Sequence, residues 1–207
     1  MQAREHWEGV YGQKRFDQVS WYAPHLGLSM RLIEQLCPQR EASIVDIGGG
    51  ESTLVDDLVD RGYTDLSVLD ISETAIDFTK KRLGNNASTV AWHVGDITQY
   101  NLGEARFDLW HDRAVFHFLT DANDRTSYVD EVGRALKPGG ALVVATFGPD
   151  GPLKCSGLEV VRYSKSLLKN QFARYFELLG SETTVHQTPA GGTQQFLYCW
   201  FRKKDQA

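Results

Sequence analysis

The sequence predicts an α/β fold: a doubly wound, mostly parallel sheet of seven strands that ends in an antiparallel C-terminal hairpin. Between residues 43 and 147, short apolar and β-branched runs alternate with amphipathic segments of helical period. Beyond residue 177, two longer strand-like runs flank the turn-forming residues Pro-Ala-Gly-Gly at 189–192. The first pattern is typical of consecutive βαβ units, and the second of a hairpin at one edge of the sheet.

The expected strands are the apolar runs. Runs that are apolar at nearly every position are typical of strands covered by helices on both faces of a parallel sheet. The parallel strands are expected at 43–47, 66–71, 89–94, 107–111 and 140–147, and the hairpin strands at 178–188 and 193–203.

The expected helices lie ahead of the first strand and between the others. An amphipathic helix over 3–14 has Trp7, Val10 and Tyr11 on one side. The other helices are expected at 25–37, 52–62, 72–84, 114–119 and 123–137.

The length and composition fit one packed domain. The chain has 207 residues, of which 42% are hydrophobic and 24% charged, so a substantial core is expected and extensive disorder is not. We expect a single domain over 1–207, in which a helical N-terminal cap (1–40) is laid over the core (43–207).

Charge and cysteine content limit the partners. The net charge of -5 argues against nucleic acid, whose phosphates need a basic surface. The three cysteines are far apart and show no CxxC spacing, which favours a reducing compartment over disulfides or a zinc site. No run approaches the ~18 apolar residues of a membrane span, and the N-terminal segment lacks the apolar centre of a signal peptide. We therefore expect a cytoplasmic protein without a metal and without a nucleic-acid or membrane partner.

The stretch VDIGGGEST, residues 45–53, places Asp46 two residues before three consecutive glycines, Gly48 to Gly50. In open parallel sheets, ligands bind beyond the carboxyl ends of the strands, at the point where the strand order reverses. Glycines there let a ligand lie against the backbone, and the following helix offers its N-terminal N–H groups. For this motif taken alone, a tight turn without a ligand is the alternative.

Polar side chains also end the next three strands. Asp70 lies about 20 residues beyond the glycines, where a carboxylate accepts hydrogen bonds from both ribose hydroxyls of an adenosine. Asp96 follows the third strand, in position to meet an adenine amino group, and His111 with Asp112 ends the fourth. One such acid is commonly a helix cap or turn residue, but four polar strand ends along one edge favour a nucleoside site.

Two nucleoside ligands are compatible with this edge. A nicotinamide dinucleotide needs a third glycine and a pyrophosphate at the helix N-terminus, but Thr53 stands at the third glycine position and Glu51 adds a negative charge. S-adenosylmethionine has no phosphate and carries an ammonium and a sulfonium, which suit Asp46. A nicotinamide-dependent oxidoreductase therefore remains an alternative to a protein that binds S-adenosylmethionine.

The motifs VDIGGGEST, LDIS, GDIT, FDLWHD and LKPGG resemble, in this order, those of class I S-adenosylmethionine-dependent methyltransferases, and the chain looks most like compact bacterial members. The resemblance covers roughly residues 43–147, with Ser52 in place of the last glycine of the usual turn. It implies a Rossmann-like methyltransferase fold, in which the hairpin supplies the reversed last strand. It also implies S-adenosyl-L-methionine as cofactor and S-adenosyl-L-homocysteine as product.

The resemblance implies that Asp46 and the glycines surround the methionine part of the cofactor and that Asp112 faces its ammonium group. An aromatic face over the sulfonium is favourable, which makes Trp21 a further candidate. The cofactor-binding set expected on these grounds is Asp46, Gly48, Gly49, Gly50, Asp70, Ile71, Asp96, Ile97, Asp112 and Trp21.

Residues that face the acceptor are expected after the fourth strand, in the cap and in the long loop 146–164. His111 and His117 are candidate bases, which matter only if the nucleophile must lose a proton, and Arg113 is a candidate to hold a substrate anion. A histidine inside an apolar run, such as His117, is more often a packed helix residue. The candidate substrate-binding residues are Tyr22, Cys155, Arg162 and Tyr163.

The expected acceptor is a small molecule, because the chain shows no extra segment for docking a macromolecule. A protein-lysine acceptor is the alternative, since residues 6–15 with Trp21 and Tyr22 are similar to the opening of a group that includes lysine methyltransferases acting on elongation factor. A noncatalytic S-adenosylmethionine-binding module is a further alternative.

Overall fold

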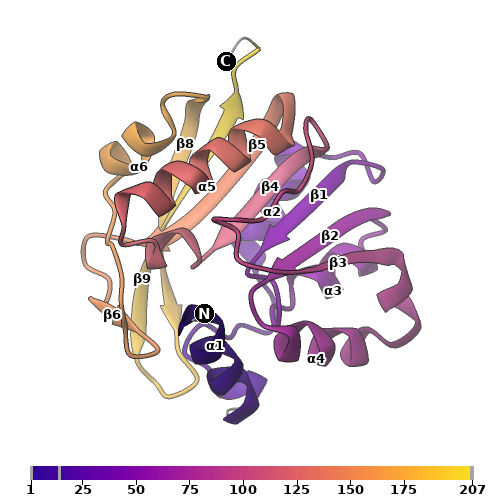
Figure 1. Cartoon of the computed structure of the whole chain (residues 1–207), viewed down its shortest axis with the longest axis vertical. Helices are drawn as coiled ribbons and strands as arrows, with labels where there is room; N and C mark the ends of the chain where they lie inside the picture. Colours follow the sequence, from indigo (N-terminus) through magenta and orange to yellow (C-terminus); the bar gives the residue numbers. More distant parts are fainter. Residues whose placement is uncertain (1, 14, 206–207) are drawn as a thin grey trace.

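The computed structural model describes residues 2–13 and 15–205 (Figure 1). Its centre is a seven-stranded sheet in the order β3-β2-β1-β4-β5-β9-β8. The first five strands of this order pair in parallel, and β9 is antiparallel to both β5 and β8. The predicted fold class is therefore confirmed. The strands of this sheet are β1 (Ser43–Ile47), β2 (Asp65–Asp70), β3 (Val90–Val94), β4 (Phe107–Arg113), β5 (Leu136–Phe147), β8 (Phe176–Gln187) and β9 (Thr193–Lys203).

Apolar clusters hold helices against both faces of the sheet. On one face, Tyr128 and Phe172 pack with Trp110 of β4, and all three side chains are fully buried. On the other face, Ile33 packs in one cluster with Ile44 of β1. Burying each such side chain stabilises the fold by roughly 1.5–3 kcal/mol. The helices are α1 (Gln2–Gln13), α2 (Gly27–Leu36), α3 (Leu54–Asp60), α4 (Glu73–Leu83), α5 (Ala122–Ala135) and α6 (Lys165–Phe172).

The N-terminal segment has two parts. Helix α2 belongs to the layer that covers the sheet, because Leu32 and Ile33 have no solvent-exposed surface. Helix α1 instead lies next to α4 at the edge of the sheet, and Figure 1 shows it in indigo apart from the layers. The segment that lies over the strand ends is therefore α1 with the residues that follow it up to about Tyr22.

Most predicted boundaries agree with the structure to within two residues, and Lys14, the predicted end of the first helix, lies outside the described residues. Strand β5 begins at Leu136 instead of residue 140. Leu136 pairs with Phe107, and its carbonyl accepts a hydrogen bond from Lys203 Nζ at 2.7 Å, so the chain enters the sheet as soon as α5 ends.

Two segments after the strands differ from their predicted form. The helix expected at 114–119 is a single 3₁₀ turn, η3 (Phe116–Phe118). The long loop 146–164 contains a two-stranded ribbon of β6 (Lys154–Cys155) and β7 (Leu158–Glu159), which the sequence did not indicate. Both segments lie at the carboxyl ends of the parallel strands, as α1 does.

The strand order reverses between β1 and β4. From β1 the sheet continues to β2 and β3 on one side, and from β4 to β5 on the other. Asp46 stands beside His111, and Ile47 stands beside Asp112, in the paired register of the two strands. The polar strand ends therefore meet at one edge, which is where open parallel sheets bind ligands.

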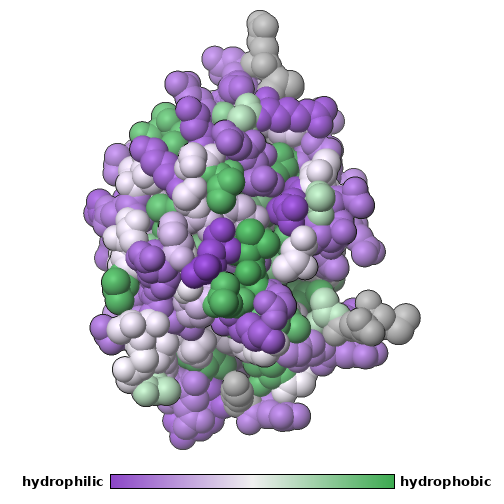
Figure 2. Space-filling view, turned by 90° about the vertical axis from the view of Figure 1, so that its left-hand side faces the viewer, coloured by the Kyte–Doolittle hydropathy of each residue, from purple (hydrophilic) through white to green (hydrophobic). Residues whose placement is uncertain are grey.

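The face shown in Figure 2 is mostly hydrophilic, with apolar side chains in small groups between polar ones. The large apolar residues that are exposed in the described chain are Leu153, Leu167, Leu179 and Val185. Among residues 2–13 and 15–205, no helix has the length and apolar character needed to cross a membrane. The same residues contain no cluster of three or more side chains suited to holding a metal ion.

Candidate active site

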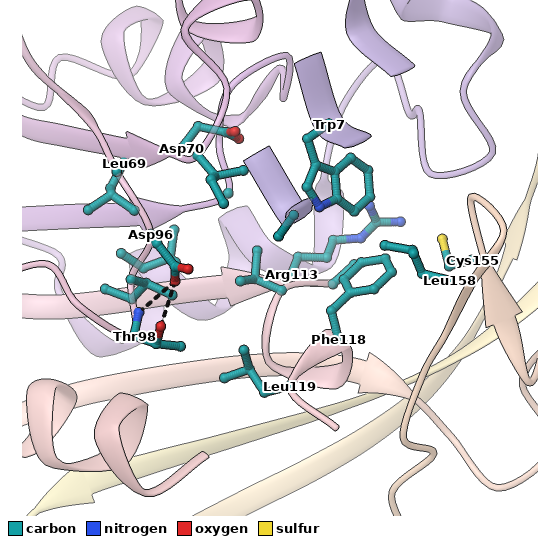
Figure 3. Close-up of a pocket in the computed structure, with 18 of the residues that line it drawn as sticks. Trp7, Leu69, Asp70, Asp96, Thr98, Arg113, Phe118, Leu119, Cys155 and Leu158 are labelled. Atoms are coloured by element: carbon teal, nitrogen blue, oxygen red, sulfur yellow. Dashed lines mark hydrogen bonds between the residues drawn. The ribbon is translucent and has the colours of Figure 1, made fainter. Parts of the chain in front are cut away.

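A cavity of about 240 Å³, the main cavity, lies at the carboxyl ends of the strands beside α1 (Figure 3). A small compartment of about 30 Å³ adjoins it and shares Tyr11, Trp21, Ile47, Gly48 and Arg113 with it. The main cavity is lined by Ala3, Trp7, Tyr11, Trp21, Ile47, Gly48, Leu69, Asp70, Ile71, Gly95, Asp96, Ile97, Thr98, Arg113, Ala114, Val115, Phe118, Leu119, Asp124, Cys155 and Leu158.

Asp70 lines the main cavity from the end of β2. Its Oδ2 accepts a hydrogen bond from Gly50 N at 2.9 Å, and its Oδ1 accepts one from Ser72 N at 2.8 Å. Burial raises the pKa of Asp70 to about 6, although the two backbone donors favour its charged form. Each carboxylate oxygen has a second lone pair, so both oxygens remain available to accept from a ligand hydroxyl.

Asp96, Ile97 and Ile71 also line the main cavity. The Oδ1 atom of Asp96 accepts hydrogen bonds from the backbone N and the hydroxyl of Thr98, at 3.0 and 2.8 Å. These bonds fix the carboxylate at the start of the turn after β3, and the apolar Ile97 lies directly beside it in the chain. Together they offer one acceptor and one apolar surface, as an adenine ring requires.

The three glycines leave room for different neighbouring side chains. Gly48 has a φ of +67° and lines both parts of the cavity, and a Cβ there would collide with Val115. Gly49 and Gly50 do not line the cavity: a Cβ would collide with the carboxylate of Asp46 at the first and with Ala75 and Asp70 at the second. The run of glycines therefore makes room for the acids as well as for a ligand.

Asp46 is buried and belongs to a chain of polar side chains that crosses the fold. Its Oδ1 accepts a hydrogen bond from His111 Nδ1 at 2.7 Å. The other ring nitrogen, Nε2, lies 2.9 Å from Ser29 Oγ, which lies 3.3 Å from the hydroxyl of Tyr198. Both nitrogens of His111 are therefore engaged within the protein, and the ring orients Asp46.

Two residues that line the small compartment each have a carboxylate oxygen that lacks a hydrogen-bond partner among the described residues. These oxygens are Asp46 Oδ2 and Glu51 Oε2, and both are buried. Burial raises the pKa of Glu51 to about 7, with Arg82 opposing the shift and Asp70 adding to it. A positively charged ligand group would satisfy both oxygens and offset the cost of burying them.

Asp112 is not part of either lining. Its carboxylate accepts hydrogen bonds from the backbone N of Val115 at 2.9 Å and of Phe116 at 3.1 Å, and from the hydroxyl of Tyr128 at 2.5 Å. Burial raises its pKa to about 6. Side chains alternate along a strand, so Asp112 points to the opposite face from His111 and Arg113, where it holds the turn after β4.

His117 is fully buried and lines neither part of the cavity. Its Nδ1 accepts a hydrogen bond from Phe147 N at 3.2 Å, and its Nε2 has no partner among the described residues. Burial, with the nearby charge of Arg113, lowers its pKa to about 3, so the ring is neutral at physiological pH. The surroundings are those of a packed histidine.

Arg113, Trp21 and Tyr22 all line the site, Arg113 and Trp21 on both parts and Tyr22 on the small compartment. Nη1 of Arg113 donates to the carbonyl of Trp21 at 3.0 Å, and its Cζ lies 4.4 Å from the ring centre of Phe196. The guanidinium is thus held toward β9, away from the acids at the ends of β2 and β3.

The loop after β5 contributes Cys155 and Leu158 to the main cavity. The other two residues predicted from this loop lie elsewhere. Arg162 is exposed and donates to Gly151 O at 3.3 Å, and Tyr163 is buried against Phe116. Neither of them lines the cavity.

Helix α1 supplies cavity residues that the sequence analysis did not assign. Trp7 and Tyr11 both line the main cavity, and burial and the nearby Asp70 and Glu51 raise the pKa of Tyr11 well above its usual value. Their position on one side of a short helix ahead of the core was the available signal. The carboxylate of Glu8 fixes this helix, because it accepts hydrogen bonds at the N-terminus of α4.

The residues present fit S-adenosylmethionine. Its ammonium matches the unpaired oxygens of Asp46 and Glu51 in the small compartment. Its ribose and adenine match Asp70 and Asp96 in the adjoining main cavity. No pyrophosphate-binding surface is offered beside the glycines, because Glu51 is buried there.

Comparison with known proteins agrees with this assignment. A family model described as a methyltransferase domain matches residues 44–140, which contain Asp46, Asp70, Asp96 and Arg113. Residues 44–140 therefore belong to the methyltransferase domain family. The methyltransferase spans about a fifth of the length of the curated relatives it matches first.

One of these relatives is the eEF1A lysine and N-terminal methyltransferase of Mus musculus, with 32% identity over 142 residues, which are 66% of this chain and 20% of the relative. Another is EEF1A lysine methyltransferase 2 of Homo sapiens, with 23% identity over 190 residues, or 85% of this chain and 75% of the relative.

Solved structures share the fold. The 1,6-didemethyltoxoflavin-N1-methyltransferase of Burkholderia thailandensis, solved with 1,6-didemethyltoxoflavin and S-adenosylhomocysteine bound, has a TM-score of 0.77 and 21% identity to the methyltransferase. The match covers 98% of this chain and 88% of that one. The relatives and neighbours thus include enzymes named for protein and for small-molecule acceptors.

Proposed function

We propose that this methyltransferase transfers the methyl group of S-adenosylmethionine to a small-molecule acceptor. The observation that supports this best is the composition of the main cavity. Asp70 and Asp96 line the part at the carboxyl ends of β2 and β3, whereas Trp7, Phe118 and Leu158 line the part toward β9. A nucleoside donor and a small acceptor can therefore occupy adjoining parts of one cavity.

The donor is held by carboxylates at three strand ends in this proposal. Asp46 and Glu51 bind its ammonium, Asp70 accepts from its ribose hydroxyls, and Asp96 accepts from its adenine amino group. When bound, S-adenosylmethionine supplies a methyl group on a positively charged sulfur: the acceptor atom bonds to the methyl carbon while the electron pair of the broken bond stays on sulfur. The product is then S-adenosylhomocysteine.

The protein mainly aligns the reactants and excludes water, which for well-oriented reactants is worth several kcal/mol of the barrier. Trp7 and Trp21 cover the cavity from the N-terminal segment. Neither His111, with both nitrogens engaged, nor the enclosed His117 is placed to take a proton from an acceptor. The proposed reaction therefore uses no histidine base.

A protein-lysine acceptor is the second candidate, because most of the relatives are named as lysine methyltransferases. It is supported less well than the first, since the guanidinium of Arg113 lines the cavity and would repel a lysine ammonium.

The test is incubation of the purified protein with methyl-labelled donor and an extract of its own cells, separated into protein and small-molecule fractions. Label in the small-molecule fraction, absent with Asp70→Ala, supports the proposal. Label confined to a protein band identifies the lysine alternative. Native mass spectrometry provides an independent check, since a protein that retains neither donor nor product contradicts the donor assignment.

We further propose that the protein works in a reducing compartment such as the cytoplasm. Cys37 and Cys199 are buried thiols, and burial raises the pKa of Cys37 to about 11 and that of Cys199 to about 12. Such thiols are unreactive and fit a protein that is not stabilised by oxidation.

A further inference from the structure

The acceptor part of the main cavity has aromatic walls. The ring centres of Trp7 and Phe118 are 5.0 Å apart, and those of Trp7 and Trp21 are 5.8 Å apart, with the planes close to perpendicular in both pairs. Edge-to-face packing of this kind leaves flat ring surfaces for a further ring to contact. Leu158 completes the apolar lining on the side of the β6–β7 ribbon.

One cation lines the same cavity. Figure 3 shows the side chain of Arg113 on the opposite side of the cavity from Asp70, extending toward Cys155 and Leu158. In the described part of the chain Arg113 makes no ion pair: it donates to the carbonyl of Trp21 and packs over the ring of Phe196. A guanidinium has five N–H donors, so most of them remain for an anionic group.

The other charged groups that line the main cavity form no ion pair with this cation among the described residues. Asp70 and Asp96 lie at the donor part and accept hydrogen bonds from the backbone. Asp124 is exposed to solvent at the start of α5. A cationic acceptor would be repelled by the guanidinium, whereas an anionic acceptor would pair with it.

The lack of a base leads to the same class of acceptor. No histidine lines the main cavity among the described residues, and the hydroxyl of Tyr11 is kept protonated by its raised pKa. An acceptor that already carries a negative charge needs no protein base to become a nucleophile. Its negative charge also makes it a stronger nucleophile toward the methyl carbon of a positively charged donor.

We propose that the acceptor is a planar aromatic molecule bearing an acidic group, a carboxylate or an acidic phenol, which Arg113 binds as the anion while the ring rests on Trp7 and Phe118. The proposal rests on the methyltransferase function proposed above, and it specifies the acceptor of that same site. It makes Arg113 the residue that selects anions over amines.

The experiment measures the binding of three planar probes to the protein saturated with S-adenosylhomocysteine. Cinnamate, cinnamamide and cinnamylammonium share one ring and carry an anionic, a neutral and a cationic group. We expect cinnamate to bind roughly ten- to a hundredfold more tightly than cinnamamide, the range of a charge-assisted hydrogen bond, and cinnamylammonium to bind most weakly. Calorimetry and quenching of tryptophan fluorescence both report the affinity.

Three variants identify the residue responsible. Arg113→Met is expected to abolish the preference for cinnamate while leaving the affinity for S-adenosylhomocysteine and for cinnamamide within a few-fold of wild type. Arg113→Lys is expected to restore part of the preference, because it keeps the charge. Arg174→Met is the matched control, since Arg174 is an exposed arginine that pairs with Asp130 away from the cavity.

Two results would overturn the proposal while leaving the donor assignment intact. One is equal or tighter binding of cinnamylammonium, which would mean an amine acceptor. The other is that Arg113→Met weakens S-adenosylhomocysteine and not cinnamate, which would assign the guanidinium to the carboxylate of the donor. Failure of the wild-type protein to bind S-adenosylhomocysteine at all would contradict the proposed function itself.

Discussion

Nδ1 of His111 donates a hydrogen bond to Oδ1 of Asp46 over 2.7 Å, and neither side chain is more than 4% exposed. The contact joins the ends of β4 and β1 at the point where the strand order reverses. It leaves the second oxygen of Asp46 without a hydrogen-bond partner among the described residues, and Asp46 lines the small compartment. In the proposed function, the imidazole therefore acts on the donor through Asp46, as a positioning residue.

Replacing His111 with Ala is expected to weaken S-adenosylhomocysteine binding by roughly 1–2 kcal/mol, because Asp46 would be left with a second unsatisfied oxygen. In kinetics the KM for the donor should rise with a small change in kcat. The matched control is His25→Ala, since His25 Nδ1 lies 2.8 Å from Asp57 Oδ1 in an exposed pair. A lower kcat at unchanged KM would instead indicate a base at position 111.

Replacing Asp70 with Ala is expected to weaken donor binding by roughly 1–3 kcal/mol, through the loss of hydrogen bonds to a charged acceptor. Since Asp70 also accepts from Gly50 and Ser72, Asp70→Asn is needed as the variant that keeps an acceptor for the backbone. Calorimetry with S-adenosylhomocysteine checks both variants. Wild-type affinity in both would remove Asp70 from the ribose assignment.

Replacing Glu51 with Gln is expected to change the pH dependence of both stability and donor binding. The pKa of Glu51 is raised from 4.5 to about 7 in the fold, so its contribution to stability is fully present below about pH 4.5 and is lost as the pH rises through 7. The variant should therefore gain roughly 1–3 kcal/mol of unfolding free energy relative to wild type between pH 5 and 8.

Donor binding should show the opposite trend, since the donor ammonium prefers the ionised carboxylate. Wild-type affinity for S-adenosylhomocysteine should rise from pH 6 to pH 8, and that of Glu51→Gln should rise less. Urea unfolding and calorimetry at both pH values measure the two effects. Comparing variant with wild type removes the contributions of His93, His117 and His186, whose lowered pKa values act in the other direction. Parallel pH curves for the two proteins would contradict the role of Glu51.

Replacing His117 is expected to affect stability and not the pH profile of turnover. His117→Phe removes the acceptor for Phe147 N and should cost roughly 1–3 kcal/mol of unfolding free energy, whereas His117→Asn keeps an acceptor and should cost less. The pH dependence of kcat should be the same in wild type and His117→Asn. A titration near neutrality that disappears with the variant would show catalysis by this ring.

Replacing Glu8 with Ala is expected to detach α1 from α4. The carboxylate accepts hydrogen bonds from Glu73 N at 2.7 Å, Ser72 Oγ at 3.0 Å and Thr74 N at 3.3 Å, so the loss should resemble that of a helix cap, roughly 0.5–2 kcal/mol. Hydrogen exchange should increase over residues 2–13, and S-adenosylhomocysteine should bind more weakly. Glu5→Ala on the exposed side of the same helix is the control. Equal exchange in the two variants would show that Glu8 does not hold the helix.

Much of the fold follows from the sequence because strand and helix periods differ so clearly between residues 43 and 147. The register of β1 and β4 and the meeting of acids at one edge follow from the topology of parallel sheets. The start of β5 does not, since Leu136 and the following residues are held by Phe107 and Lys203, which are distant in sequence.

The donor side of the site was more accessible to sequence analysis than the acceptor side. Asp46, Asp70 and Asp96 come from strand ends, whose direction the fold determines. For His117, the direction depends on the turn after β4, where Ala114 adopts a φ of 73° and the alternation of the strand ends. For Asp112, which lies within β4, the alternation itself would have separated the side chain from those of its neighbours in the strand.

Tyr198, on the last strand of the sheet, stands at the far end of the polar chain that begins at Asp46. During synthesis on the ribosome β9 emerges after all the other strands of the sheet. The hydroxyl that completes the support of the donor-binding acid is therefore in place only when the sheet has closed. In the proposed function, a nascent chain lacking β9 would hold the ammonium of the donor poorly, and tight binding would report that folding is complete.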